Sequence, residues 1–284
     1  MFEKLKSLLP IEKMTKGGSY SAKEYYKKKS SGYGYGYGKT ETEETEEVGF
    51  LGKNSSFAVT EAFKLLRTNL SFAFPSDEKC RVMGVTGALK GVGKSLVSLN
   101  LAYTTAQTES RVLLIEGDMR MPTVARRTQL KPTPGLSNML AGLVPFEEAV
   151  QHYSPHLDVL TAGDIPPNPS DLLGSRAMEK FLNSCKDNYD YVIVDLPPLM
   201  VSDALVVSRF LYGVVLVVRQ NYDEKAATAE MMRQLHIVGV KVLGVVYNQT
   251  ENGKRNYGSY NRYYNRYKSK SQNYYHEYFR TGSY

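Results

Sequence analysis

Short apolar runs alternate with amphipathic stretches through the middle of the chain, between about residues 50 and 250. The apolar runs are rich in Val, Ile and Leu and carry no polar face; they lie at 81–87, 111–118, 157–163, 189–198, 213–220 and 241–248. Strands of this kind are typical of a parallel sheet that helices cover on both faces. The pattern therefore predicts one doubly wound α/β domain with a mostly parallel sheet.

Helices are predicted between these strands, at 94–108, 170–185, 202–211 and 224–236. A further helix precedes the first strand, where Ala58, Ala62 and Leu66 recur at helical spacing and Thr60 is the expected start. No apolar run approaches the roughly 20 residues that cross a bilayer. The first residues also lack the apolar core of a signal peptide, so we expect a cytoplasmic protein.

The two ends of the chain differ in composition from this domain. Residues 1–49 contain the repeat GYGYGYG and the acidic run ETEETEE, and we expect this segment to be mostly disordered because it cannot bury enough apolar surface. Residues 251–284 form a tyrosine-rich tail without aliphatic side chains. The predicted organisation is a low-complexity segment at 1–49, a folded domain at 50–250 and the tail at 251–284.

The net charge of +7 comes from the ends of the chain. Residues 1–40 carry nine Lys against three Glu, and residues 252–284 carry seven Lys and Arg against one Glu. Basic ends suit nucleic acid, an anionic membrane or an acidic partner, and charge alone does not choose among them. The two cysteines, Cys80 and Cys185, have no metal-ligand or CxxC spacing, which is typical of reduced cytosolic thiols.

The segment TGALKGVGKS follows one predicted strand and opens a helix, which is the context of a phosphate-binding P-loop. Glycines at 91 and 93 allow backbone N–H groups to approach phosphate oxygens. The Lys94 ammonium would reach the β- and γ-phosphates, and the Ser95 hydroxyl would ligate Mg²⁺. The expected nucleotide-binding residues are Ala88, Lys90, Gly91, Val92, Gly93, Lys94, Ser95 and Leu96. The motif therefore predicts binding of ATP with Mg²⁺.

Carboxylates stand at the ends of two other predicted strands. VIVDLPP ends on Asp195, and VLLIEGDMR ends on Glu116 and Asp118. In a doubly wound sheet the ligand lies at the carboxyl ends of the strands, so these side chains are candidates for holding Mg²⁺ or accepting a proton. Taken singly, each could also be a helix cap or a turn residue.

In combination, these motifs resemble the bacterial tyrosine kinases (BY-kinases) of capsule and exopolysaccharide synthesis, over about residues 56–284. That family carries a Walker A motif, a Walker A′ motif D-x-D-x-R, a Walker B motif D-x-P-P and a C-terminal tyrosine cluster; here these are ALKGVGKS, IEGDMR, VDLPP and the tail. The stretch AGDIPPNPSDLLGS at 162–175 is also similar to the family. EAFKLLR resembles its E-x-x-R-x-x-R oligomerisation motif, with Glu61, Lys64 and Arg67 at the motif positions.

The resemblance implies a MinD/ParA-like P-loop fold and a role for each motif residue. Asp118 and Asp195 would hold hydrated Mg²⁺, Arg120 would lie beside the phosphates, and Asn248 would contact adenine. Lys94 would stabilise the transferred phosphoryl group. The first acid of the A′ motif serves the family as the base that accepts the tyrosine proton, and here it is Glu116 instead of Asp. The extra methylene can displace the carboxylate by about 1 Å, which can cost on the order of 100-fold in rate.

The tail tyrosines are the expected phosphate acceptors of such a kinase; they are Tyr257, Tyr260, Tyr263, Tyr264, Tyr267, Tyr274, Tyr275, Tyr278 and Tyr284. Alternative interpretations are a merely adhesive segment or a site for single-stranded nucleic acid, since aromatic and basic residues together suit one. Beside this P-loop we favour the substrate tail and do not expect a nucleic-acid partner.

The resemblance also implies partners. The family forms ring-like homo-oligomers in which each tail enters a neighbour's active site. Members whose kinase domain is a chain of its own, without a membrane span, require a transmembrane adaptor, which is a regulator of polysaccharide chain length. We also expect a cognate tyrosine phosphatase and recruitment to the inner face of the plasma membrane. Two alternatives remain at this point: a MinD/ParA-type positioning ATPase, or a weakly active ATP-binding regulator. Lys90 lies one residue away from the signature-lysine position of the positioning ATPases, which argues against the first.

Overall fold

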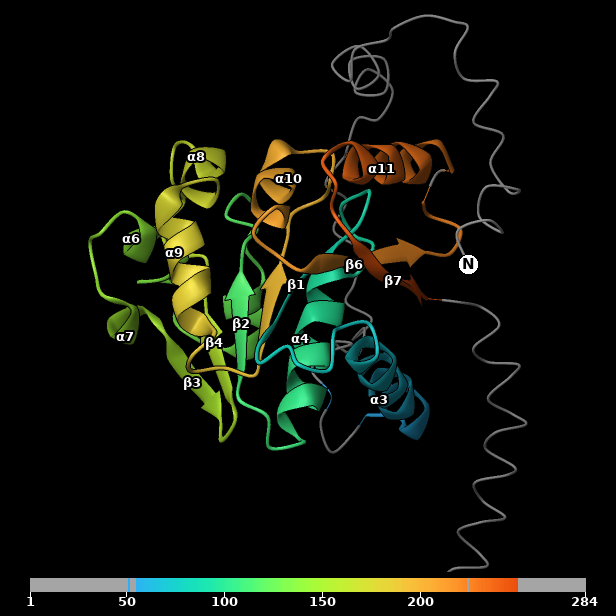
Figure 1. Ribbon diagram of the computed structural model, residues 1–284, viewed down its shortest axis with the longest axis horizontal. Coiled ribbons are helices and arrows are strands. Elements are labelled where there is room, and N and C mark those ends of the chain that lie inside the picture. Colours follow the sequence, from blue (N-terminus) through green and yellow to red (C-terminus); the bar gives the residue numbers. More distant parts are fainter. Residues whose placement is uncertain (1–50, 52–54, 224, 250–284) are drawn as a thin grey trace, which may run out of the picture. The chain divides into compact units, whose positions relative to one another are not determined.

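The computed structural model describes residue 51, residues 55–223 and residues 225–249. Within that part of the chain, one seven-stranded sheet has the order β3-β4-β2-β5-β1-β6-β7 (Figure 1). Its strands are β1 (Arg81–Thr86), β2 (Val112–Glu116), β3 (Gln151–Ser154), β4 (Leu157–Leu160), β5 (Tyr191–Asp195), β6 (Gly213–Arg219) and β7 (Val242–Asn248). Neighbouring strands are parallel except for the antiparallel pair β3–β4. The predicted doubly wound, mostly parallel α/β fold is therefore confirmed.

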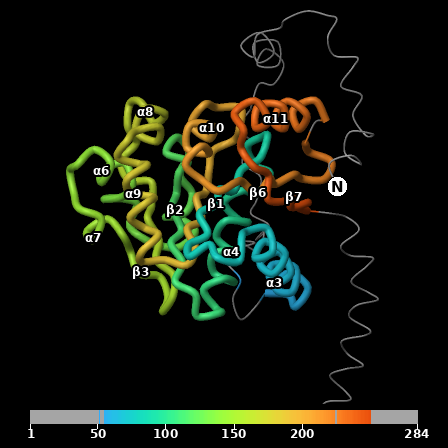
Figure 2. Tube along the Cα trace, viewed as in Figure 1, coloured from blue at the N-terminus to red at the C-terminus, as the bar shows by residue number. Residues whose placement is uncertain are grey.

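Helices cover both faces of this sheet. They are α3 (Phe57–Ser71), α4 (Lys94–Ala106), α5 (Val124–Thr128), α6 (Leu136–Leu140), α7 (Phe146–Ala149), α8 (Pro169–Leu173), α9 (Arg176–Cys185), α10 (Ser202–Ser208) and α11 (Lys225–Ile237). The Cα trace in Figure 2 shows α3 and α4 together near β1 and β7, and α8 to α11 along the other side.

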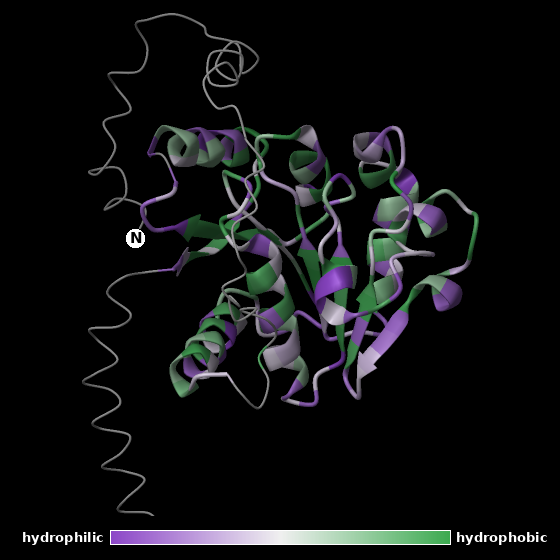
Figure 3. Cartoon of the chain, turned by 180° about the vertical axis from the view of Figure 1, so that it is seen from behind, coloured by the Kyte–Doolittle hydropathy of each residue, from purple (hydrophilic) through white to green (hydrophobic). Residues whose placement is uncertain are grey.

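Two apolar cores follow from the alternation of side chains along each strand. In β2, Leu113 and Ile115 face the core under α6 to α11, whereas Val112 and Leu114 face the core under α3 and α4. All four of these side chains are buried, and the central strands are apolar on both faces (Figure 3). The edge strand β3, with the sequence QHYS, is the polar exception.

Three local features differ from the sequence-based expectation. The helix expected at 170–185 is two helices, because α8 ends at Leu173, before Gly174, and the Ser175 hydroxyl then caps α9 by accepting from the Met178 N–H at 3.2 Å. The first helix begins at Phe57, not at Thr60, since the Ser56 side chain caps it. Strand β3 and the short helices α5 to α7 were not predicted, because none carries an apolar period.

No helix in the described part of the chain is long and apolar enough to cross a membrane. Cys80 and Cys185 are free, buried thiols. The segment at 1–49 and the tail at 251–284 lie outside the described residues, so their expected disorder and the tail tyrosines stay predictions.

Candidate active site

The carboxyl ends of three neighbouring strands bring the predicted motifs together. Asp195 at the end of β5 is in register with Val85 of β1 on one side and with Glu116 of β2 on the other. The P-loop connects β1 to α4, so it begins beside Asp195. The Thr86 hydroxyl donates to the Pro197 carbonyl oxygen at 2.8 Å and joins the loop to the chain after β5. This edge of the sheet is where an open α/β fold places its ligand.

The P-loop has the backbone conformation that its glycines allow. Gly91 and Gly93 have φ values of 81° and 99°, which lie in the left-handed region that glycine adopts without strain. A Cβ atom at Gly93 would lie 2.2 Å from Nδ2 of Asn248, so the Asn248 side chain would have to move away from the loop. Gly93 then caps α4, whose first residues are Lys94 and Ser95. The loop thus ends at the positive end of a 13-residue helix, as an anion site requires.

Lys94 and Asp195 are buried charges at the centre of the site. Burial lowers the pKa of Lys94, against the attraction of Asp195, Asp118 and Asp223. Burial raises the pKa of Asp195 to about 7, although the nearby Ser95 and Ser98 hydroxyls lower it. Ser98 Oγ donates to Asp195 Oδ1 at 2.9 Å, while Asp195 Oδ2 is buried and has no hydrogen-bond partner among the described residues. A buried carboxylate oxygen without a partner costs free energy unless a cation or a donor reaches it.

Glu116 is held by three backbone amides. Its Oε1 accepts from the N–H groups of Thr123 and Val124, the latter at 2.6 Å, and its Oε2 accepts from the Ala162 N–H at 3.2 Å. The side chain is 1% exposed, and burial raises its pKa even though these three amides lower it. Both oxygens of Glu116 are therefore engaged in joining β2 to the start of α5 and to the end of β4.

Asp118 is the more open of the two A′ carboxylates. It is half-buried, and its Oδ1 accepts from the Met121 N–H at 3.1 Å. Burial raises its pKa, while the Met121 amide and the charge of Lys94 lower it. The site residues thus include one fully engaged carboxylate, Glu116, and one accessible carboxylate, Asp118.

Arg120 points to α10. Its Nε donates to Asp203 Oδ2 at 2.7 Å and its Nη2 to Asp203 Oδ1 at 3.1 Å, and the Ser170 hydroxyl also donates to Asp203. Burial works against ionisation of Asp203, but Arg120 and Ser170 outweigh it and lower the pKa of this carboxyl. Arg120 therefore connects the A′ loop to the first turn of α10.

The outer side of the P-loop is contacted by side chains from β6, β7 and the β6–α11 loop. Arg219 Nη1 donates to the Gly91 carbonyl oxygen at 3.3 Å, and the Tyr222 hydroxyl donates to the Lys90 carbonyl oxygen at 3.0 Å. Asn248 Nδ2 donates to the Val92 carbonyl oxygen at 2.9 Å. Asn248, expected at the adenine, thus lies against the P-loop in this structure, and its contact with adenine stays a prediction.

The three positions of the expected oligomerisation motif lie on α3. Lys64 Nζ pairs with Glu61 Oε1 at 2.8 Å on the helix surface, whereas Arg67 Nη1 donates to the Thr104 carbonyl oxygen at 2.9 Å and joins α3 to α4. Glu61 and Lys64 are thus placed on the surface of α3, and Arg67 already has a contact within the chain.

Sequence reasoning missed several residues of this site: Ser98, Asp203, Arg219 and Tyr222. Ser98 is one helical turn after Lys94, a spacing that would have placed it on the same face of α4 as Lys94. The other three carry no sequence signal of their own, because each acts through a long-range contact.

The fold and the site together define a P-loop NTPase of the ParA type. A family model for ParA, described as "NUBPL iron-transfer P-loop NTPase", matches residues 79–278. This match covers the sheet, the P-loop and the carboxylates at the strand ends.

Comparisons with individual proteins identify the family within this class. Tyrosine-protein kinase YwqD of Bacillus subtilis (strain 168) is 38% identical over 204 residues, which are 71% of this chain and 86% of YwqD. Tyrosine-protein kinase etk of Escherichia coli (strain K12) is 36% identical over 207 residues, which are 72% of this chain and 28% of etk. The solved kinase domain of E. coli ETK aligns with a TM-score of 0.64 and covers 68% of this chain and 77% of that domain. The chimerical protein CapA2B2 also aligns with a TM-score of 0.64, at 36% identity, and covers 67% of this chain and 84% of CapA2B2. The chain belongs to the bacterial tyrosine kinases, and the expected enzyme class, a tyrosine-protein kinase, is confirmed.

Proposed function

We propose that this chain binds Mg·ATP at its P-loop and transfers the γ-phosphoryl group to tail tyrosines of a neighbouring copy. One observation carries the proposal: the P-loop, Lys94 and Asp195 meet at one edge of the sheet, and a buried oxygen of Asp195 lacks a partner among the described residues. In this proposal the kinase domain spans 50–250, and the tail at 251–284 is its substrate.

Support for Mg²⁺ comes from the chemistry of the donors. The described residues include no group of three or more His, Cys, Asp or Glu that could hold a metal ion. Mg²⁺ in phosphotransferases is commonly bound by one or two carboxylates together with phosphate and water oxygens. Ser95 and Asp195, with Asp118 through water, are a donor set of that kind. Loop amides at 91–93 and the Lys94 ammonium would bind the phosphates.

Within this proposal the chain's own residues position the reactants and move one proton. Bound Mg·ATP supplies the phosphoryl group and neutralises its charge. Lys94 stabilises the charge that develops on transfer. Asp118 accepts the proton of the tyrosine hydroxyl, because it is half-buried and accessible, whereas both oxygens of Glu116 are engaged by backbone amides. Glu116 instead holds the backbone at 123–124 and 162 in place.

The remaining partners belong to the same proposal. We infer a homo-oligomer built through α3, a transmembrane adaptor that recruits the chain to the inner face of the plasma membrane, and a phosphatase that reverses the modification. The cellular role would be control of capsular or exopolysaccharide synthesis. The relatives that are named tyrosine-protein kinases support the kinase activity on which this role depends.

The experiment incubates the full chain with γ-labelled ATP, Mg²⁺ and the cytoplasmic fragment of an adaptor, with Lys94→Met as the inactive control. Peptide mapping should find label on tail tyrosines, and only with intact Lys94. Release of labelled phosphate without labelled protein would instead indicate a positioning ATPase. Nucleotide binding with neither product would indicate a regulator.

A further inference from the structure

Three consecutive peptide units of the P-loop are held from outside. The carbonyl oxygens of Lys90, Gly91 and Val92 accept, in that order, from the Tyr222 hydroxyl at 3.0 Å, from Arg219 Nη1 at 3.3 Å and from Asn248 Nδ2 at 2.9 Å. The three donors come from β6, from β7 and from the loop after β6. They lie more than 120 residues from the P-loop in sequence, so the contacts exist only in the folded domain.

Because peptide units are rigid, these contacts also fix the direction of the N–H groups in the P-loop. In a trans peptide the C=O of one residue and the N–H of the next are fixed in one plane and point in opposite directions. A donor that holds the C=O of residue 90 outward therefore directs the N–H of residue 91 inward. The same reasoning applies to the N–H groups of residues 92 and 93. These are the successive amides that a P-loop presents to phosphate oxygens.

We propose that Tyr222 and Arg219, together with Asn248, form a latch that holds the P-loop amides in their phosphate-binding orientation. These are positioning residues, since they contact the loop from the side opposite to the phosphates. This inference depends on the proposed nucleotide site and adds to it the residues that hold the P-loop backbone in its conformation. Without these contacts, the glycines at 91 and 93 would allow the loop more backbone conformations than other residue types would allow at the same positions.

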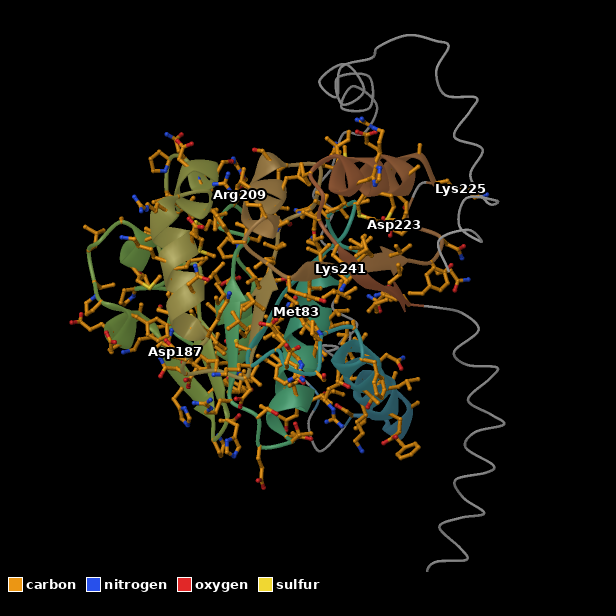
Figure 4. All side chains as sticks on the ribbon, in the orientation of Figure 1. Met83, Asp187, Arg209, Asp223, Lys225 and Lys241 are labelled. Atoms are coloured by element: carbon orange, nitrogen blue, oxygen red, sulfur yellow. The ribbon has the colours of Figure 1, made fainter. Side chains whose placement is uncertain are left out.

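The latch residues are themselves held in place. Arg219 stacks over the Tyr222 ring, with Cζ at 4.8 Å from the ring centroid. The Arg219 N–H donates to Asp223 Oδ2 at 2.5 Å, and the Gln220 N–H donates to the Asn248 carbonyl oxygen at 3.1 Å. Asp223, labelled in Figure 4, lies in the loop that joins β6 to α11. Arg219, Tyr222 and the loop between β6 and α11 therefore form one connected unit.

The chain offers closely matched controls. Arg209 Nη2 donates to the Gly174 carbonyl oxygen at 2.7 Å, and the same guanidinium stacks over Phe210 at 4.6 Å, beside α10 (Figure 4). It repeats the two contacts of Arg219 at a place away from the P-loop. The Tyr212 hydroxyl, which accepts from Lys241 Nζ at 2.6 Å, is the control for the Tyr222 hydroxyl.

The test measures displacement of a fluorescent ADP from the full chain by ADP and by AMP, with Mg²⁺ present. Tyr222→Phe keeps the ring and its stacking and removes one donor, so we expect ADP affinity to fall about threefold to tenfold, the range of one hydrogen bond. AMP affinity should change less, because AMP lacks the β-phosphate, and Arg219→Met should act in the same direction. Tyr212→Phe and Arg209→Met should bind both nucleotides like the wild type, and every variant is checked for cooperative unfolding at a temperature well above that of the binding assay.

Two results would overturn the latch but leave the proposed nucleotide site standing. If Tyr222→Phe binds ADP like the wild type, the contact does not orient the loop. If ADP and AMP affinities fall equally, the residue supports the fold alone. Should Arg219→Met unfold, the isosteric Tyr222→Phe decides by itself. A wild-type chain that does not bind ADP at all would overturn the proposed nucleotide site first, and the latch with it.

Discussion

Substitution of Glu116 separates its structural role from a role as the catalytic base. Glu116→Gln keeps the shape of the side chain and one acceptor oxygen, which retains the bonds from the N–H groups of Thr123 and Val124. The new amide group would face the Ala162 N–H, a donor against a donor, where Oε2 now accepts at 3.2 Å. Leaving that buried N–H unpaired costs about 1–3 kcal/mol. We therefore expect the free energy of unfolding to fall by roughly that amount.

The effect on catalysis should be small by comparison. If Asp118 accepts the proton, Glu116→Gln should lower kcat by less than about tenfold, whereas Asp118→Asn should lower it by about 10²–10⁴, the range for loss of a general base. The catalytically competent form of Asp118 is deprotonated, so kcat should fall at acid pH as this carboxylate becomes protonated. That acid limb should persist in Glu116→Gln and disappear in Asp118→Asn.

The assay combines urea unfolding with the pH profile of tyrosine phosphorylation under single-turnover conditions. Glu116→Asp adds a second test, because the D-x-D-x-R motif that this sequence resembles has Asp at this position. On our account the shorter side chain cannot reach all three amides, so stability falls and activity does not rise. A gain of activity in Glu116→Asp, or a 100-fold loss in a stably folded Glu116→Gln that lacks the acid limb, would refute the reasoning and make Glu116 the base.

Three further predictions concern Asp203, Arg67 and the two buried cysteines. Asp203→Asn should lower the free energy of unfolding by about 1–3 kcal/mol at pH 7. Because the pKa of Asp203 is lowered in the folded chain, the wild type should lose this extra stability as the pH falls below the ordinary pKa of an aspartate. Equal urea midpoints of the wild type and the variant at pH 7 would contradict the Arg120 pairing. Arg67→Met should lower the free energy of unfolding by about 1.5–3 kcal/mol, since it removes a charged hydrogen bond to the Thr104 carbonyl. Lys64→Met, in an exposed ion pair, should lower it by no more than about 1 kcal/mol. Equal melting midpoints of the two variants would contradict this difference. Burial raises the pKa of Cys80 to about 11 and of Cys185 to about 12, so neither thiol should react with a disulfide reagent at pH 8 until urea is added, and rapid labelling of the folded chain would show that they are accessible.

The sheet and its ligand edge could be predicted because their signals are local. Apolar runs with no polar face, as in β2 and β5, indicate strands buried on both sides. Once the strands are parallel, their carboxyl ends lie at one edge of the sheet, so the P-loop, Glu116 and Asp195 were expected at that edge; the strand order β2-β5-β1 then places them next to one another. The spacing of Gly93, Lys94 and Ser95 after a strand was sufficient to recognise the phosphate site.

The remaining features depend on contacts that leave no local pattern. β3 is short and polar, and it is a strand only because it pairs with β4. Arg120 was expected at the phosphates, and its partner Asp203 lies 83 residues away in the sequence. Glu116 is engaged by backbone amides, and Tyr222 and Arg219 bind backbone carbonyls, which every residue type possesses. Such contacts cannot be inferred from side-chain identity.

The central claim, transfer of phosphate to the tail of another copy, can be tested by mixing two variants. One is Lys94→Met, which keeps its tail but lacks the P-loop lysine; the other keeps Lys94 and has all nine tail tyrosines replaced by Phe. With γ-labelled ATP, Mg²⁺ and an adaptor fragment, our account predicts label on the tail of the Lys94→Met chain in the mixture and on neither variant alone. Absence of tail label from the mixture, with phosphate still released from ATP, would contradict it.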